Sequence, residues 1–188
     1  MEAFLNSALM VAIGEIGDKT NILALMLAVR YKTTTPIILG ILVATIANHL
    51  LAALVGVYLS HFAFAAYLPW ILSLSFIALG LWVLIPDKVE DEAAPKKDYG
   101  AFLTTIVAFF LAEMGDKTQI ATLALAAKYQ DIVMVIAGST LGLMLANVPV
   151  IFFGEKLLSR IPMVWVHRAA ALLFIGFGVS GLIGLLVR

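Results

Sequence analysis

The sequence predicts an all-α membrane protein of six transmembrane helices, arranged as two inverted three-helix repeats. Composition is the first indication: 63% of the residues are hydrophobic and the mean hydropathy is +1.06. A soluble domain is closer to 45–50% apolar. The second indication is a series of apolar stretches of membrane length, and the third is a six-residue pattern that occurs twice, 98 residues apart.

Six apolar stretches approach the roughly 20 residues that an α-helix needs to cross the hydrocarbon core of a bilayer. They cover residues 4–28, 36–59, 66–85, 102–126, 132–154 and 165–187. The longest polar segment, a charged linker over residues 87–100, divides the chain into a first repeat (1–86) and a second repeat (101–188). No basic segment precedes the first stretch, so we expect a retained helix rather than a signal peptide.

The repeated pattern lies in the first and fourth stretches. Its copies are Glu15-Ile16-Gly17-Asp18-Lys19-Thr20 and Glu113-Met114-Gly115-Asp116-Lys117-Thr118. The register continues beyond the pattern, because Tyr31 falls on Tyr129 and Gly40 on Gly138. Each three-helix repeat holds an odd number of expected spans, so the second repeat must insert in the opposite orientation to the first. Inverted repeats place substrate sites near the bilayer midplane, where the copies meet.

The basic residues predict the orientation. With the N-terminus outside the cell, the cytoplasmic side holds eight basic residues and the opposite side holds two, Lys19 and Lys117 being set aside as intramembrane. The eight are Arg30, Lys32, Lys88, Lys96, Lys97, Lys156, Arg160 and Arg168, and the two are Lys128 and Arg188. The positive-inside rule therefore places both termini on the non-cytoplasmic side. The brevity of the chain is typical of bacterial proteins and suggests the inner membrane.

The pattern puts charge where charge is costly: an ionised side chain at a helix centre in the bilayer costs about 2.5–3.5 kcal/mol on insertion scales. On a straight helix Asp18 would lie about 60° to one side of Glu15, and Lys19 about 40° to the other. If both faces meet, Glu15, Asp18, Glu113 and Asp116 surround one point. Carboxylate oxygens suit hard cations such as Ca²⁺, Mg²⁺ and Mn²⁺. Without a cation such carboxylates repel and some hold protons, so metal entry would release protons.

The side chains near the four carboxylates each have more than one possible role in the site. Lys19 and Lys117 follow the glutamates by four residues, the favourable order for an intrahelical ion pair, and we expect them to neutralise the empty site. Thr20 and Thr118 lie about 140° from the glutamates on a straight helix, so we favour a distortion at Gly17 and Gly115. Close helix packing is the other use of these glycines. Asn48 and Asn147 are candidate neutral ligands, with interhelical hydrogen bonds as the alternative.

Several functions are disfavoured. Twelve basic and twelve acidic residues cancel, which gives no sign of a nucleic-acid partner, and the chain has no cysteine for a thiolate site. Neither a phosphate-binding loop nor a His-Glu-x-x-His pattern occurs, so we expect a transporter driven by an ion gradient, not an enzyme, with no cofactor. A passive cation channel and an exporter of a cationic amino acid stay open as alternatives. The expected partners are a divalent cation, protons and lipid, with a homo-oligomer as a further option.

The two copies of the pattern carry a resemblance. Glu-φ-Gly-Asp-Lys/Arg-Thr/Ser, once in each three-helix half, resembles the signature of the MneA and Golgi calcium–manganese transporter family within the lysine-exporter-like superfamily. Both copies fit at every position, and the resemblance covers nearly the whole chain. It implies a secondary transporter that moves Mn²⁺, or Ca²⁺, out of the cytoplasm in exchange for H⁺. The identity of the ion and the direction of transport come from this resemblance alone.

Overall fold

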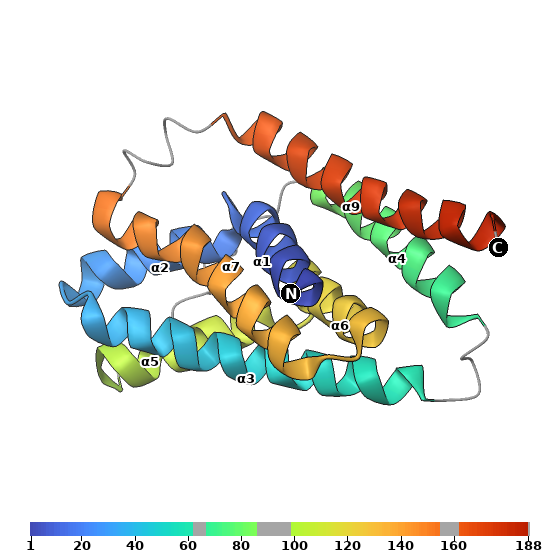
Figure 1. Ribbon diagram of the computed structural model, residues 1–188. Coiled ribbons are helices and arrows are strands. Elements are labelled where there is room, and N and C mark those ends of the chain that lie inside the picture. Colours follow the sequence, from blue (N-terminus) through green and yellow to red (C-terminus); the bar gives the residue numbers. More distant parts are fainter. Residues whose placement is uncertain (62–66, 86–98, 155–161, 188) are drawn as a thin grey trace.

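The computed structural model describes residues 1–61, 67–85, 99–154 and 162–187. The described part is helical, as expected. Its helices are α1 (Glu2–Glu15), α2 (Lys19–Tyr31), α3 (Thr35–Ser60), α4 (Leu68–Val83), α5 (Gly100–Glu113), α6 (Lys117–Tyr129), α7 (Ile132–Phe153) and α9 (Met163–Leu186) (Figure 1). Most of the charged linker, residues 86–98, lies outside the described residues, as do Lys88, Lys96, Lys97, Lys156, Arg160 and Arg188.

Three of the described helices are long and apolar enough to cross a membrane: α3, α7 and α9. The shorter apolar helices α4 and α5 fall within two more of the expected stretches. The first expected span corresponds to the pair α1 and α2, and the fourth to the pair α5 and α6. The all-helical class is therefore confirmed, and each stretch that carries the repeated pattern is two half-helices rather than one continuous helix.

The break between the half-helices has the same backbone geometry in both copies. Ile16 and Met114 are extended, with ψ of 116° and 121°, and the following glycines have positive φ, 82° at Gly17 and 75° at Gly115. Such φ values suit glycine because it has no Cβ. An aspartate then begins the second half-helix as its N-cap, the position that aspartate favours. The distortion favoured from the sequence is thus confirmed.

Close contacts between the two halves of the chain come in reciprocal pairs. Gly40 packs on the backbone of Phe102, and Gly138 packs on the backbone of Phe4, each partner lying 98 residues from its equivalent. Two further pairs of contacts are reciprocal in the same way. One pair is Gly56 with Leu123 and Gly154 with Leu25, and the other is Gly80 with Ala171 and Gly178 with Ser73. In helical terms, α1 and α2 pack on α7, α5 and α6 pack on α3, and α4 lies beside α9 (Figure 1).

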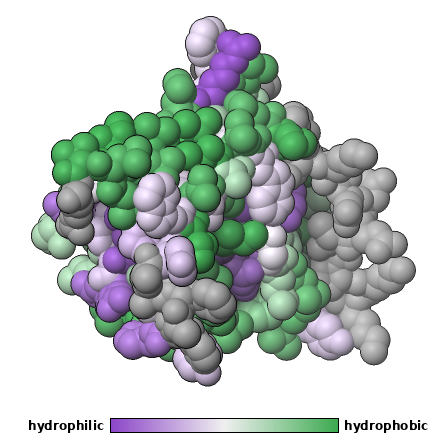
Figure 2. All heavy atoms as spheres, turned by 90° about the vertical axis from the view of Figure 1, so that its right-hand side faces the viewer, coloured by the Kyte–Doolittle hydropathy of each residue, from purple (hydrophilic) through white to green (hydrophobic). Residues whose placement is uncertain are grey.

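Polar side chains gather inside this bundle and apolar ones cover it. The buried polar residues include two glutamates, two aspartates, a lysine, three asparagines and His49. Large apolar side chains are exposed along every described helix except α6, among them Leu111, Leu145 and Leu172. Most of the described surface on the face in Figure 2 is accordingly hydrophobic. This is the reverse of a soluble domain, and it suits a protein whose outer surface meets lipid and whose interior holds a polar site.

Candidate metal site

Three carboxylates from the repeated pattern converge in the interior. One oxygen from each of Glu15, Glu113 and Asp116 lies within 4.8 Å of the other two, and all three residues are buried. Glu15 ends α1, Glu113 ends α5 and Asp116 begins α6, so the two breaks bring them together. Oxygens at this spacing can share one cation, and carboxylate oxygens are the ligands that Mn²⁺, Ca²⁺ and Mg²⁺ prefer.

The threonines turn toward the carboxylates because the helix is broken. The Thr20 hydroxyl donates to Glu15 Oε2 at 2.8 Å. In the second copy the Thr118 hydroxyl lies 3.3 Å from Glu113 Oε2 and 3.4 Å from Asp116 Oδ2. The other carboxylate oxygen, Oε1, has no hydrogen-bond partner among the described residues in either glutamate. A buried charge without a partner is costly, so these two oxygens suit a bound cation or proton.

The motif lysines cross between the two copies. Lys19 Nζ lies 3.0 Å from Asp116 Oδ1, and Lys117 Nζ lies 3.6 Å from Asp18 Oδ1. Both lysines thus face a motif carboxylate of the other copy rather than only the glutamate four residues before them. A glutamate and a lysine four residues apart face each other only on an unbroken helix, and here they lie on opposite sides of a break.

Asp18 stands apart from the other three carboxylates. It does not join the group whose oxygens lie within 4.8 Å of one another, although it too is buried. Its Oδ1 faces the ammonium group of Lys117. Equivalent positions in the two copies therefore have different surroundings: Asp116 faces both a lysine and the two glutamates, whereas Asp18 lies outside the cluster.

A matched chain of side-chain amides holds each break. The Gly17 N–H donates to Asn21 Oδ1 at 2.7 Å, and the Asn21 amide donates to Asn147 Oδ1 at 3.0 Å. In the second copy the Gly115 N–H donates to Gln119 Oε1 at 2.7 Å. The Gln119 amide then donates to Asn48 Oδ1, also at 2.7 Å.

Each of these amide relays links a break in one half of the chain to a long helix of the other half. Asn147 belongs to α7 and Asn48 to α3. The oxygen of each asparagine accepts a hydrogen bond from the relay, which is the interhelical alternative weighed from the sequence. Asn21 and Gln119, which bond the glycines directly, follow the repeated pattern in the sequence, and this position is the signal that points to them.

The two breaks differ in what covers them. A Cβ atom added at Gly17 would clash with Met163 Sδ at the start of α9, whereas one added at Gly115 would meet no atom of the described residues within 4 Å. The Lys19 side chain is 31% exposed and that of Lys117 is 6% exposed. Among the described residues, the Gly17 break is therefore covered by Met163, and no described side chain covers the Gly115 break in the same way. Sequence reasoning did not identify Met163.

An apolar helical exterior, paired broken helices and a buried carboxylate cluster together define a membrane transporter for a hard cation. Comparison with known proteins gives the particular family. The sequence profile of the family described as "Divalent cation/proton antiporter GDT1" matches residues 3–91 and 101–186. The chain belongs to this family and is a divalent cation/proton antiporter.

Similarity to individual proteins supports the same family assignment. The chain is 46% identical over 166 residues to a Vibrio cholerae protein named "Putative manganese exporter", an alignment that covers 88% of this chain and 82% of the relative. It is 30% identical over 200 residues to the GDT1-like protein sll0615 of Synechocystis, covering 95% and 96% of the two chains. It is 28% identical over 223 residues to GDT1-like protein 5 of Arabidopsis thaliana, covering 97% and 96%. No solved structure matches the chain.

Proposed function

We propose that this antiporter exports Mn²⁺ from the cytoplasm in exchange for H⁺, with Ca²⁺ as a second substrate. The name of the Vibrio cholerae relative supports Mn²⁺ and the direction of transport. The chemistry of the site agrees, because its candidate ligands are carboxylate and hydroxyl oxygens, which suit both ions. The observation that carries the proposal is the group of three buried carboxylates from both copies of the pattern.

The cation ligands are Glu15, Glu113 and Asp116. The two Oε1 atoms that lack hydrogen-bond partners offer ready coordination positions. Thr20 and Thr118 hold the opposite oxygens of the glutamates and can add a hydroxyl ligand. Asp18 is a further candidate ligand, and Lys117 neutralises its charge in the empty site. Asn48 and Asn147 act through Gln119 and Asn21 as positioning residues rather than as direct ligands.

The charges of the site suggest the exchange ratio. Four motif carboxylates and the two motif lysines leave two negative charges when all six groups are ionised. One divalent cation neutralises these, and so do two protons. We therefore infer an exchange of two protons for each cation, with Lys19 and Lys117 as permanent counter-ions. The site would then remain neutral in either loaded state, which limits the electrostatic cost of holding it in a low-dielectric interior.

The two halves form inverted repeats in the inner membrane, with six spans and both termini on the non-cytoplasmic side. The reciprocal glycine contacts support the twofold relation. Each contact between a glycine of one half and a residue of the other half recurs between the equivalent residues with the two halves exchanged. In this arrangement each pair of half-helices makes one span. Alternating access would come from movement of one repeat against the other around the fixed carboxylates. The candidate site draws all its residues from one chain, so a homo-oligomer is not needed to build it.

The test is transport by the purified protein in liposomes that are loaded with a pH indicator. Mn²⁺ flux should follow an imposed pH gradient and move protons in the opposite direction. Glu113→Gln should abolish this flux because it removes a shared ligand, whereas Glu2→Gln, at an exposed acid outside the pattern, should leave it intact. Flux that ignores the pH gradient would favour a channel. Lysine or arginine flux without divalent flux would favour the amino-acid exporter.

A further inference from the structure

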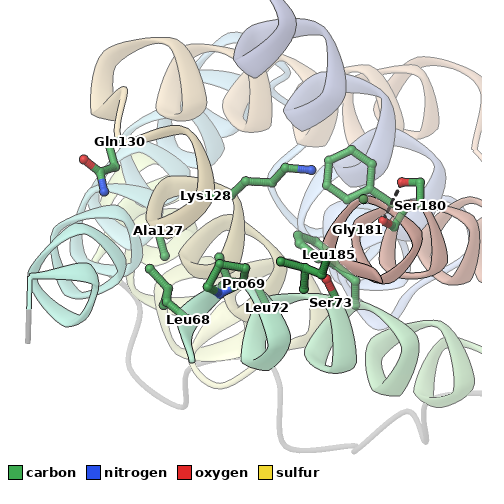
Figure 3. A pocket seen from close by; sticks show the side chains of 13 residues that line it. Leu68, Pro69, Leu72, Ser73, Ala127, Lys128, Gln130, Ser180, Gly181 and Leu185 are labelled. Atoms are coloured by element: carbon green, nitrogen blue, oxygen red, sulfur yellow. Dashed lines mark hydrogen bonds between the residues drawn. The ribbon is translucent and has the colours of Figure 1, made fainter. Parts of the chain in front are cut away.

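A cavity of about 480 Å³ lies between α4, α6 and α9, at the end of the molecule where α6 and α9 finish and α4 begins. Its volume falls within the range of about 300–1,000 Å³ that is usual for small-molecule sites. None of the four motif carboxylates lines it, so it is separate from the candidate metal site. Apolar side chains form most of the wall, including Leu68, Leu72, Phe76 and Leu185 (Figure 3).

Lys128 supplies the charge in this cavity. Its side chain extends from α6 across the cavity toward α9 (Figure 3), and its Nζ lies 3.7 Å from the centroid of the Phe177 ring. An aromatic ring attracts a cation without neutralising it. Within the described part of the chain, no carboxylate lies at ion-pair distance from Lys128, although Glu2 acts on it from farther away. The ammonium group is therefore still able to bind an anion.

Two glycines of α9 shape the apolar part of the cavity. Gly181 allows close approach to α4, because a Cβ atom there would clash with the Ser73 hydroxyl. A Cβ atom at Gly184 would meet no atom of the described residues within 4 Å, so no described side chain fills the cavity at this position. The lining residues of α9 run from Phe177 to Leu185, a depth of about 12 Å along the helix. The cavity is thus an apolar slot beside a cation at one end of α6.

We propose that this cavity binds an anionic phospholipid, with the phosphate at Lys128 and an acyl chain along α4 and α9. The surrounding solvent of a membrane protein at this depth is lipid, and helix ends lie at the level of the lipid headgroups. A lysine at this level attracts anionic headgroups. Gln130 and Ser180 offer further polar atoms on the lining, while the leucine and phenylalanine side chains match an acyl chain. The site would tie the α4–α9 pair to α6.

The proposal can be tested by native mass spectrometry of the purified protein with phosphatidylglycerol and phosphatidylcholine of identical acyl chains. The wild type should prefer phosphatidylglycerol by about fivefold, the ratio expected for one lysine at a membrane surface. Lys128→Gln should remove this preference and Lys128→Arg should keep it. Gly184→Phe should fill the slot and reduce binding of both lipids. Gly176→Phe is the matched control, because a side chain there also meets no atom within 4 Å but does not line the cavity.

Thermal unfolding of each variant checks that it is folded. If Gly184→Phe does not fold, Leu72→Trp narrows the same slot from the α4 side. Equal retention of the two lipids by the wild type would overturn the proposal, and so would an unchanged preference in Lys128→Gln. Displacement of phosphatidylglycerol by millimolar inorganic phosphate, together with full binding by Gly184→Phe, would show a simple anion site and would also overturn it.

Discussion

At the scale of single residues, the two cross-copy ion pairs differ in burial. Both Lys117 and Asp18 have side chains only 6% exposed, whereas Lys19 is 31% exposed. Removing one partner of a buried pair leaves an uncompensated charge, at a cost of about 3–5 kcal/mol. The carboxylates left behind, Asp116 at 4% and Asp18 at 6% exposure, are buried alike, so we expect both Lys19→Gln and Lys117→Gln to lower the free energy of unfolding, as measured by denaturant unfolding in detergent without divalent cations.

Lys32→Gln is the control for this comparison. Lys32 ends α2 in the left-handed conformation, with φ of 52°, and the equivalent position in the second copy is already glutamine, Gln130 with φ of 53°. The substitution should therefore leave stability unchanged. Equal stability of Lys117→Gln and Lys32→Gln would mean that Asp18 does not depend on Lys117 for its charge balance.

The amide relays give a second prediction at this scale. Gln119 accepts directly from the Gly115 N–H, whereas Asn48 accepts from Gln119 and donates to the Phe110 carbonyl of α5, one turn before the break. Gln119→Ala should weaken Mn²⁺ binding several-fold, because the break loses the group that fixes it, and Asn48→Ala should have a smaller effect. The double variant should resemble Gln119→Ala alone, since members of one network are not additive. Calorimetric Mn²⁺ titrations of the three variants measure this, and strictly additive losses would contradict the relay.

At the scale of elements, each broken helix depends on one glycine. Alanine at a positive φ costs about 1–2 kcal/mol, and this strain should reduce stability in both Gly17→Ala and Gly115→Ala. Gly17→Ala should be slightly the more damaging, because the flexible Met163 side chain must also move away from its methyl group. Thermal unfolding of the two variants gives the comparison.

The same clash allows a rescue experiment. Met163→Ala removes the sulfur that covers Gly17, so it should recover part of the stability lost in Gly17→Ala and none of that lost in Gly115→Ala. Recovery in both backgrounds, or in neither, would mean that the difference between the breaks does not come from this contact.

The sequence predicts much at this scale because the repeat is internal. Shifting the chain by 98 residues aligns Glu15 with Glu113 and Gly17 with Gly115, and hydropathy alone identifies the apolar stretches. The paired pattern then implies that both copies contribute to one site. Thr20 even signals the break, because its hydroxyl would point away from Glu15 on a straight helix and instead donates to it.

What the sequence does not predict are the contacts that differ between the copies or cross between them. The lysines pair across the two copies because each break separates Lys19 from Glu15, which helical spacing cannot show. The separation of Asp18 from the other carboxylates breaks the twofold relation among the described residues. A repeat in sequence contains no information on such asymmetry, because equivalent residues have the same sequence context in both copies.

At the scale of the whole molecule, the proposed charge balance has an electrical consequence. Exchange of one divalent cation for two protons moves no net charge, so the rate of Mn²⁺ flux should be independent of membrane potential. Potassium gradients with valinomycin can impose a potential across liposomes while both sides are held at the same pH. A flux that rises steeply with potential would show that the ratio differs from two protons for each cation and would contradict the proposed charge balance.

The proposed alternating access requires that the site opens to one side at a time. Among the described residues, Met163 covers the Gly17 break, whereas Met114, next to the Gly115 break, is 54% exposed. Under the proposed topology the start of α9 lies at the cytoplasmic side, so we expect the entry beside Gly17 to be cytoplasmic and the entry beside Gly115 to face outward. Because the chain has no cysteine, single cysteines can report on this directly.

Met114→Cys should react quickly with a membrane-impermeant maleimide added from outside, and Ile16→Cys, its equivalent beside the covered break, should react slowly. Bound Mn²⁺ should slow the reaction at Met114→Cys if the cation occupies the adjacent carboxylates. Alternating access further requires that conditions favouring the inward-facing state reverse the order, so that Ile16→Cys reacts from the cytoplasmic side. The rates are measured in whole cells and in inverted vesicles. Equal rates at the two positions from either side would exclude a one-sided opening and favour a continuous pore.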